Sequence, residues 1–150
     1  MTRGHIDLVE RALQLFDSVT VAVAENISKR PVFDLAERLE LLQQVLPDSP
    51  RIKVTSFSGL VVDYCREQSI SVVVRGLRTV SDFEYEYQMA LTNRHMSPQV
   101  ETVFVMPSPE YSFISSTLIK DIVRHGGDVS DFVPEEVERQ LRDRLAGGAE

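Results

Sequence analysis

Ser71-Val72-Val73-Val74-Arg75-Gly76-Leu77-Arg78 is the most informative segment of this 150-residue sequence. Three consecutive valines without polar alternation are typical of a short strand that is covered by helices on both faces, as in parallel sheets. The two arginines that follow surround a glycine, which allows the backbone to approach a ligand closely. The segment therefore predicts a buried strand that ends at a candidate anion-binding turn.

The same alternation of strand and helix continues on both sides of this segment. The predicted strands are Val19–Ala24, Ile52–Phe57, Ser71–Arg75 and Thr102–Met106. The predicted helices are His5–Phe16, the stretch between the cap Asp34 and Pro47, Leu60–Gln68, Ser81–Met96, Ser115–Arg124 and Pro134–Ala146. Two of them begin with a predicted capping box, Asp34 with Glu37 and Ser81 with Glu84. The alternation indicates an α/β fold with three layers, a Rossmann-like parallel sheet flanked by helices.

Composition narrows the class of protein further. A mass of 17.0 kDa with 43% hydrophobic residues predicts one domain over residues 1–150, with a frayed tail at 146–150. Cys65 is the single cysteine, which excludes an internal disulfide and favours a reducing cytoplasm. A net charge of -7 argues against a broad nucleic-acid surface, and no apolar run has the length of a membrane span.

Ligands of open α/β sheets gather beyond the carboxyl ends of the strands, and three places there stand out. The first is Arg75 with Arg78, whose guanidinium groups suit phosphate. The alternative interpretation is that both are surface arginines paired with Asp82 and Glu84.

The second place is the hydroxyl-rich helix start between Ser112 and Thr117. Free amide groups and the helix dipole attract anions there, and hydroxyl groups add further donors. Ordinary N-capping is the alternative explanation for at least one of these serines, and Lys120 is either a phosphate partner or a solvated cation.

The third place is Gly4-His5 at the start of the first helix. The positive end of the helix dipole disfavours a charged imidazole, and a neutral imidazole can donate a hydrogen bond to a phosphoryl group. Taken alone, His5 is equally well explained as an ordinary helix-start histidine, and Lys29 as one cation on a loop.

Several motifs in register carry a resemblance to a known family. They are Thr2-Arg3-Gly4-His5, Ser28-Lys29, Arg75-Gly76-Leu77-Arg78, Asp82-Phe83-Glu84-Tyr85-Glu86, Asn93-Arg94-His95 and Tyr111-Ser112-Phe113-Ile114-Ser115-Ser116-Thr117. In order and spacing they resemble the phosphopantetheine adenylyltransferase family, which belongs to the nucleotidyltransferases with an H/T-x-G-H signature. The resemblance extends from Thr2 to the final helix.

The resemblance implies transfer of the adenylyl group of ATP to 4'-phosphopantetheine, which gives 3'-dephospho-coenzyme A and pyrophosphate in coenzyme A synthesis. It implies Mg²⁺ bound mainly through the ATP phosphates, and a homohexamer. By matching position, His5, Lys29 and Arg75 would be the catalytic residues, and Lys29, Arg75 and Val61 would bind phosphopantetheine. The residues implied for ATP are His5, Gly76, Leu77, Arg78, Glu86, Tyr111, Ser112, Phe113, Ile114, Ser115, Ser116 and Thr117.

One departure from the family pattern has a structural consequence. The family opens with a strand and a turn like Tyr-Pro-Gly-(Ser/Thr)-Phe-Asp-Pro, whereas Met1 directly precedes Thr2 here. Since that strand is central in the family's sheet, we expect a gap of roughly 9 to 10 Å between the strands at Val19–Ala24 and Val72–Arg75. Our hypothesis is that the natural protein starts upstream, and that this chain is less stable and less active than an extended one.

Two other functions remain open at this point. One is another nucleotidyltransferase of the same signature, acting on glycerol phosphate or nicotinamide mononucleotide. The other is a catalytically impaired nucleotide-binding subunit, which the missing strand favours and the presence of His5, Lys29 and Arg75 disfavours.

Overall fold

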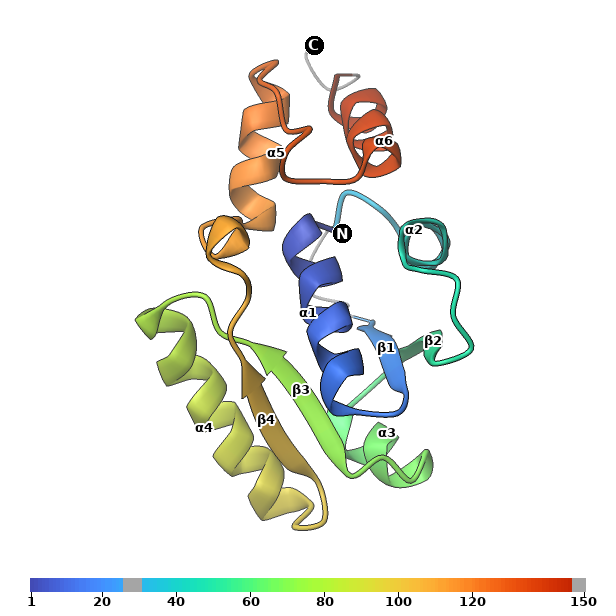
Figure 1. Cartoon of the computed structure of the whole chain (residues 1–150), viewed down its shortest axis with the longest axis vertical. Helices are drawn as coiled ribbons and strands as arrows, with labels where there is room; N and C mark the ends of the chain where they lie inside the picture. Colours follow the sequence, from blue (N-terminus) through green and yellow to red (C-terminus); the bar gives the residue numbers. More distant parts are fainter. Residues whose placement is uncertain (26–30, 147–150) are drawn as a thin grey trace.

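The computed structural model describes residues 1–25 and 31–146. The elements in chain order are α1 (Arg3–Leu15), β1 (Val19–Ala24), α2 (Leu35–Val45), β2 (Ile52–Phe57), α3 (Val61–Glu67), β3 (Val72–Gly76), α4 (Val80–Met96), β4 (Glu101–Val105), η1 (Pro109–Tyr111), α5 (Ser116–Arg124) and α6 (Glu135–Ala146) (Figure 1). This order confirms the predicted α/β fold. The predicted frayed tail beyond Ala146 lies outside the described residues.

The strands of the described ranges form two parallel pairs, β1 with β2 and β3 with β4. Val19 faces Ile52 in the first pair, and Val72 faces Glu101 in the second. β1 and β3 belong to different sheets, which confirms that they are not hydrogen-bonded neighbours, and the expected distance between them stays a prediction. The expected burial of the strands on both faces is wrong for most of their residues, which are half-buried. The physical reason is that a strand of a two-stranded sheet has one open edge.

Local capping explains where α2 and α4 begin. The Asp34 carboxylate accepts the Glu37 amide at 2.9 Å, and Glu37 accepts the Asp34 amide at 2.8 Å, so this predicted capping box is confirmed. The predicted box at Ser81 is wrong. Thr79 caps α4 instead, accepting the Asp82 amide at 3.2 Å, which starts the helix at Val80.

The largest hydrophobic core lies among helices and loops rather than on the strands. Its buried members are Phe33, Leu41, Ile114, Ile119, Val123, Val129, Val133, Val137 and Leu141. A second core packs α1 and α2 against the β1–β2 pair, and a third, around Val62, Cys65 and Val100, lies beside β3. Cys65 is 3% exposed in this third core, which confirms its predicted role as a core residue, and its burial raises the pKa of the thiol.

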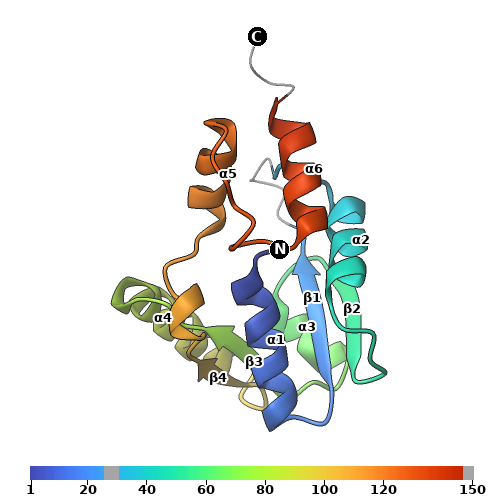
Figure 2. The same cartoon turned by 45° about the horizontal axis from the view of Figure 1, so that its top comes forward.

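The elements are arranged so that helix α1 begins where the strands end. Figure 2 shows α1 running along the strands, with α5 and α6 beyond its N-terminal end. The arrow of β1 points toward the same end. Among the described residues, no helix combines the length and apolar character needed to cross a membrane.

Candidate functional site

Three segments far apart in the sequence meet at the start of α1. A Cβ placed on Gly4 would lie 3.4 Å from Cβ of Tyr111, and one placed on Gly76 would lie 3.2 Å from a methyl group of Leu8. A larger residue at Gly76 would therefore require the Leu8 side chain to shift slightly, so β3 and α1 pack closely here. A third contact joins the turn after β3 to the segment before α5, because Arg78 Nη1 donates to the Ile114 carbonyl at 2.8 Å.

His5 is oriented by the residue that precedes its helix. The Thr2 backbone N–H donates to His5 Nδ1 at 3.2 Å, and Thr2 Oγ1 lies 2.7 Å from the same nitrogen. Because Nδ1 accepts these bonds, the ring proton is assigned to Nε2, which is then a donor. Desolvation by the surrounding protein atoms, the positive charge of the N-terminal amino group and the charge of Arg78 lower the pKa of His5 to about 4, although the residue keeps exposed surface. The imidazole is therefore neutral at pH 7.

Arg75, near the end of β3, and Arg78, in the turn that follows, are both held by carboxylates of α4. Arg75 binds Glu86 through two bonds, from Nε at 2.8 Å and from Nη2 at 2.6 Å. Arg78 Nε donates to Asp82 at 3.0 Å. In the alternative interpretation, the pairing with Asp82 is present, whereas Glu84 is not a partner and Glu86 takes its place. Asp82 and Glu86 lie four residues apart and share one face of α4, which explains the choice.

These pairs orient the guanidinium groups without hiding them from a ligand. The hydrogen bonds and the charge of Glu86 raise the pKa of Arg75. The hydrogen bonds and charge of Arg78 lower the pKa of Asp82. The Arg75 side chain remains 50% exposed, whereas that of Glu86 is 12% exposed. Both cations therefore remain at the surface with a fixed direction.

In the segment from Tyr111 to Thr117, some hydroxyl groups stabilise the local backbone and others are exposed to solvent. Ser115 Oγ accepts the Leu118 amide at 3.1 Å, so ordinary N-capping explains this serine, while Ser116 and Thr117 are exposed in the first turn of α5. Ser112 Oγ donates to the Pro109 carbonyl at 2.9 Å. The Ile114 side chain is buried in the helical core. Its backbone carbonyl accepts the hydrogen bond from Arg78.

The remaining predicted residues form no hydrogen bond with His5 within the described ranges, or lie outside those ranges. Phe113 is 61% exposed and packs edge-on against Phe132, at 5.8 Å between ring centroids. Leu77 is fixed by its backbone, because its N–H donates to the Val105 carbonyl at 3.0 Å. Val61 is the first residue of α3 and packs beside the Val62 and Cys65 core. Lys29 lies outside the described residues.

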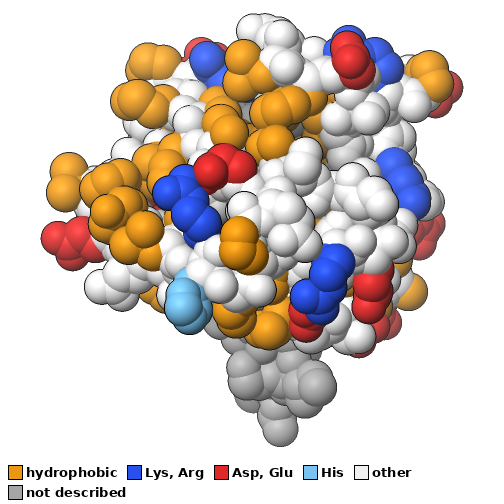
Figure 3. Space-filling view, turned by 90° about the horizontal axis from the view of Figure 1, so that it is seen from below, with side chains coloured by type: hydrophobic (Ala, Val, Ile, Leu, Met, Phe, Trp, Pro, Cys, Tyr) orange, Lys and Arg blue, Asp and Glu red, His pale blue; other side chains and the backbone are white. Residues whose placement is uncertain are grey.

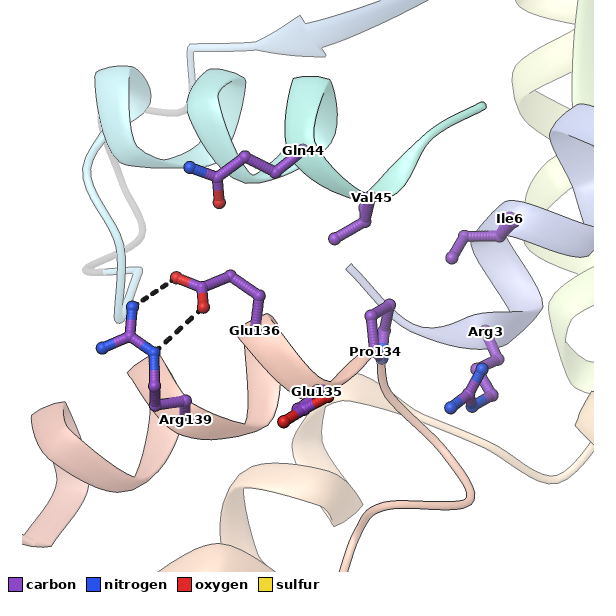
Figure 4. Close-up of a pocket in the computed structure, with 8 residues that line it drawn as sticks. All are labelled: Arg3, Ile6, Gln44, Val45, Pro134, Glu135, Glu136 and Arg139. Atoms are coloured by element: carbon purple, nitrogen blue, oxygen red, sulfur yellow. Dashed lines mark hydrogen bonds and ion pairs between the residues drawn. The ribbon is translucent and has the colours of Figure 1, made fainter. Parts of the chain in front are cut away.

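A hollow of about 510 Å³ opens beside this site, between the start of α1, the end of α2 and the start of α6 (Figure 4). The residues that line it are Arg3, Ile6, Gln44, Val45, Pro134, Glu135, Glu136 and Arg139. Arg3 and Ile6 flank His5 in the sequence, but the predicted site residues of the described ranges are not among the lining residues. We therefore define the site by His5, Arg78 and the start of α5, together with Arg75, which is held by Glu86 and lies three residues before Arg78 in the chain.

Sequence reasoning missed one polar cluster at this site. Asp7 accepts two hydrogen bonds from Ser108, one from the amide at 2.8 Å and one from the hydroxyl at 2.6 Å. These residues are 101 positions apart, so the sequence held no spacing signal for the pair. A serine placed between two prolines directly after a predicted strand was the one local hint that a loop is anchored there.

Comparisons with known proteins agree on one class. The sequence model described as "Cytidylyltransferase-like" matches residues 1–122. A curated protein named "Phosphopantetheine adenylyltransferase" from Desulforudis audaxviator (strain MP104C) is 51% identical over 145 residues, which are 97% of this chain and 89% of that protein. A protein of the same name from Paraburkholderia phymatum (strain DSM 17167 / CIP 108236 / LMG 21445 / STM815) is 52% identical over 146 residues, which are 97% of this chain and 87% of that protein. The chain belongs to the cytidylyltransferase-like family and, within it, to the phosphopantetheine adenylyltransferases, as the motifs suggested.

Proposed function

We propose that this chain transfers the adenylyl group of ATP to 4'-phosphopantetheine, giving 3'-dephospho-coenzyme A and pyrophosphate. The names of relatives that are about half identical over nearly the whole chain support the reaction. The structural observation that carries the proposal is a neutral imidazole near the Arg78 guanidinium, which binds the Ile114 carbonyl just before the hydroxyl-rich start of α5, while Glu86 orients Arg75.

The reaction asks little covalent chemistry of the protein. The phosphate of phosphopantetheine attacks the α-phosphorus of ATP in line, the bond to the β-phosphate oxygen breaks, and pyrophosphate leaves. Catalysis then consists of holding two anions together and stabilising charge on the α-phosphoryl oxygens. His5 Nε2–H would donate to one of these oxygens, because Nδ1 is already engaged by Thr2.

The proposed substrate residues divide into two groups. Arg75 and Lys29 would hold the phosphate of phosphopantetheine, with Val61 along the pantetheine arm. The bonds of Arg75 to Glu86 use Nε and Nη2, so Nη1 remains as a donor for that phosphate. The residues proposed for ATP are His5, Gly76, Leu77, Arg78, Glu86, Tyr111, Ser112, Phe113, Ile114, Ser115, Ser116 and Thr117.

Magnesium would enter as part of the MgATP substrate. Within the described ranges, no group of three or more His, Cys, Asp or Glu side chains is arranged to hold a metal ion. Phosphate oxygens and water are ligands that Mg²⁺ accepts readily, and the protein would then contribute by neutralising the rest of the charge.

We also propose a homohexamer located in the cytoplasm. The support for assembly is the apolar surface of α4, where Val80, Phe83, Tyr85, Tyr87 and Leu91 are all exposed. Exposed apolar patches of this kind mark protein interfaces. Figure 3 views the molecule from the end where α4 and α3 finish, and hydrophobic side chains gather over part of that face.

A pyrophosphate-release assay tests the reaction. With MgATP, we expect release to depend on 4'-phosphopantetheine and not on glycerol phosphate or nicotinamide mononucleotide. Release with either of the latter alone would identify a different nucleotidyltransferase. Binding of ATP without release for any acceptor would identify the chain as a nucleotide-binding subunit and refute the proposal.

A further inference from the structure

Asp7 lies on α1 two residues after His5 and is the centre of a closed polar cluster. Its carboxylate accepts the Ser108 amide and hydroxyl, and it also accepts Arg11 Nε, at 3.2 Å to Oδ1 and 3.1 Å to Oδ2. Arg11 Nη2 in turn donates to Ser108 Oγ at 2.7 Å. We call Asp7, Arg11 and Ser108 the α1 clasp. Each of its members binds both of the others.

The energetics of the clasp make it a rigid connection. The Asp7 side chain is only 13% exposed, and a carboxylate withdrawn from water requires strong donors. Burial alone would raise the pKa of Asp7, but the hydrogen bonds of Ser108 and the nearby Arg11 outweigh it and lower the pKa. Charge-assisted bonds of this kind are shorter and stronger than neutral ones. The clasp is more than a helix-surface ion pair, because Ser108 lies on a different segment.

The α1 clasp holds one end of the loop that carries the proposed ATP residues, because Ser108 belongs to that loop. Ser108 comes three residues before Tyr111, at the start of the loop that leads from β4 to α5. The far end of the same loop is held by Arg78, which binds the Ile114 carbonyl. The loop that carries the proposed ATP residues is therefore fastened at one end to the helix of His5 and at the other end to the turn of the two arginines.

We propose that Asp7 is a positioning residue for adenylyl transfer, which holds the loop from Ser108 to Ile114 at a fixed distance from His5. This inference rests on the proposed function. The loop would contact ATP, whereas the proposed phosphopantetheine residues Arg75 and Val61 lie on other elements. Loss of the clasp should therefore displace ATP relative to His5 and leave the binding of phosphopantetheine nearly unchanged.

The test uses the full chain with graded changes. Asp7→Ala removes every bond of the carboxylate, Asp7→Asn keeps one acceptor oxygen and removes the charge, and Ser108→Ala removes only the hydroxyl. Ser108→Thr retains a hydroxyl and serves as the conservative rescue. Asp143→Ala is the matched control, because Asp143 also pairs with an arginine four residues away, at 3.6 Å, and is 71% exposed on α6.

Pyrophosphate release and amide hydrogen exchange are measured well below the melting temperature of each variant. For Asp7→Ala we expect kcat to fall about 10- to 100-fold, because a displacement near 1 Å has that cost. The KM for ATP should rise several-fold, the KM for phosphopantetheine should change less than about twofold, and the Ser108 amide should exchange faster. Asp7→Asn should show the same changes to a smaller extent, and Ser108→Ala to a still smaller extent. If Asp7→Ala does not fold, these two variants test the inference. Ser108→Thr and Asp143→Ala should behave as the unchanged chain.

Two results would overturn the inference. One is a folded Asp7 variant with unchanged kcat and unchanged KM for ATP. The other is an equal rise in KM for both substrates, which points to general loosening. If the unchanged chain shows no release with any acceptor, the proposed function has failed, and the clasp is judged by calorimetry with ATP. Weaker ATP binding together with faster Ser108 exchange in Asp7→Asn then supports it, and unchanged values refute it.

Discussion

Helices α4 and α5 follow the two strands of one sheet, β3 and β4, but they differ in how they use their apolar residues. Helix α5 buries Ile119 and Val123 in the largest core, with 2% and 7% exposed. Helix α4 leaves Val80 and Tyr85 exposed at 80% and 62%. The buried residue of α4 in the described structure is polar, Asn93. Apolar content alone therefore did not decide which helix joins the core.

The difference follows from the arrangement of apolar residues around each helix. In α5 they recur on one face, which is the arrangement that buries against a core. In α4 they occur all around the helix, interrupted by Asp82 and Glu86, which hold Arg78 and Arg75. Helix α5 is thus built to stabilise the chain, whereas α4 is built to orient two arginines on one side and, as we propose, to meet other subunits on another.

The largest expected effect tests the difference in burial. Ile119→Ala on α5 should lower the free energy of unfolding by about 2 to 5 kcal/mol, the usual cost of a cavity in a core. Leu91→Ala on α4, where Leu91 is 46% exposed, should change it by less than about 0.5 kcal/mol in the monomer. Urea unfolding at low protein concentration measures both. Equal costs would mean that the comparison between the two helices is mistaken.

The next effect concerns the polar side of α4. Arg75→Ala should reduce the rate of pyrophosphate release about 100- to 1,000-fold, as removal of a preorganised donor does elsewhere. Glu86→Gln should cost about tenfold. If Glu86 acts by orienting Arg75, the KM for phosphopantetheine rises in this variant, whereas direct contact with the nucleotide raises the KM for ATP.

Arg66→Ala is the control for that experiment. Arg66 pairs with Asp63 on α3 at 2.6 Å, away from the converging segments, and its loss should leave the rate within about twofold. A loss similar to that of Arg75→Ala would show that the assay responds to any arginine.

A smaller effect tests the exposed apolar residues of α4. Tyr85→Glu places a charge on this surface and should shift the chain toward smaller species at micromolar concentration, because a charge buried in an interface is costly. Tyr85→Phe keeps the apolar area and should retain the mass of the unchanged protein. Sedimentation equilibrium measures both variants. Equal masses for all three proteins would separate α4 from assembly.

The smallest effect concerns His5, which lies near Arg78 of the turn between β3 and α4. Its pKa is lowered to about 4 in the folded chain from an ordinary value of 6.5, so the unfolded chain binds more protons between these values. Acidification from pH 6.5 to pH 4 should therefore destabilise the folded protein, and His5→Gln should reduce that dependence. Melting temperatures across this window provide the test, and identical slopes for both proteins would contradict the assignment of a neutral imidazole.

Most element boundaries could be predicted because they depend on neighbouring residues. The strands at 19–24 and 52–57 agree with β1 and β2, and the Asp34 capping box agrees with the start of α2. The Ser81 box failed because Thr79, two residues earlier, competed for the same helix start. The alternative interpretation named Glu84 rather than Glu86 as a partner of the two arginines, because which carboxylate faces Arg75 depends on the direction in which α4 leaves the turn.

The sequence by itself determined the order of helices and strands, the residue types available for anion binding and the family resemblance, since all three depend on residues close together in the chain. Only the tertiary structure decided that Arg78 binds the Ile114 carbonyl and that Asp7 binds Ser108. The physical reason is the range of the interactions. Caps and apolar periodicity act over three or four residues, whereas pairs 36 and 101 positions apart exist only after the chain has packed.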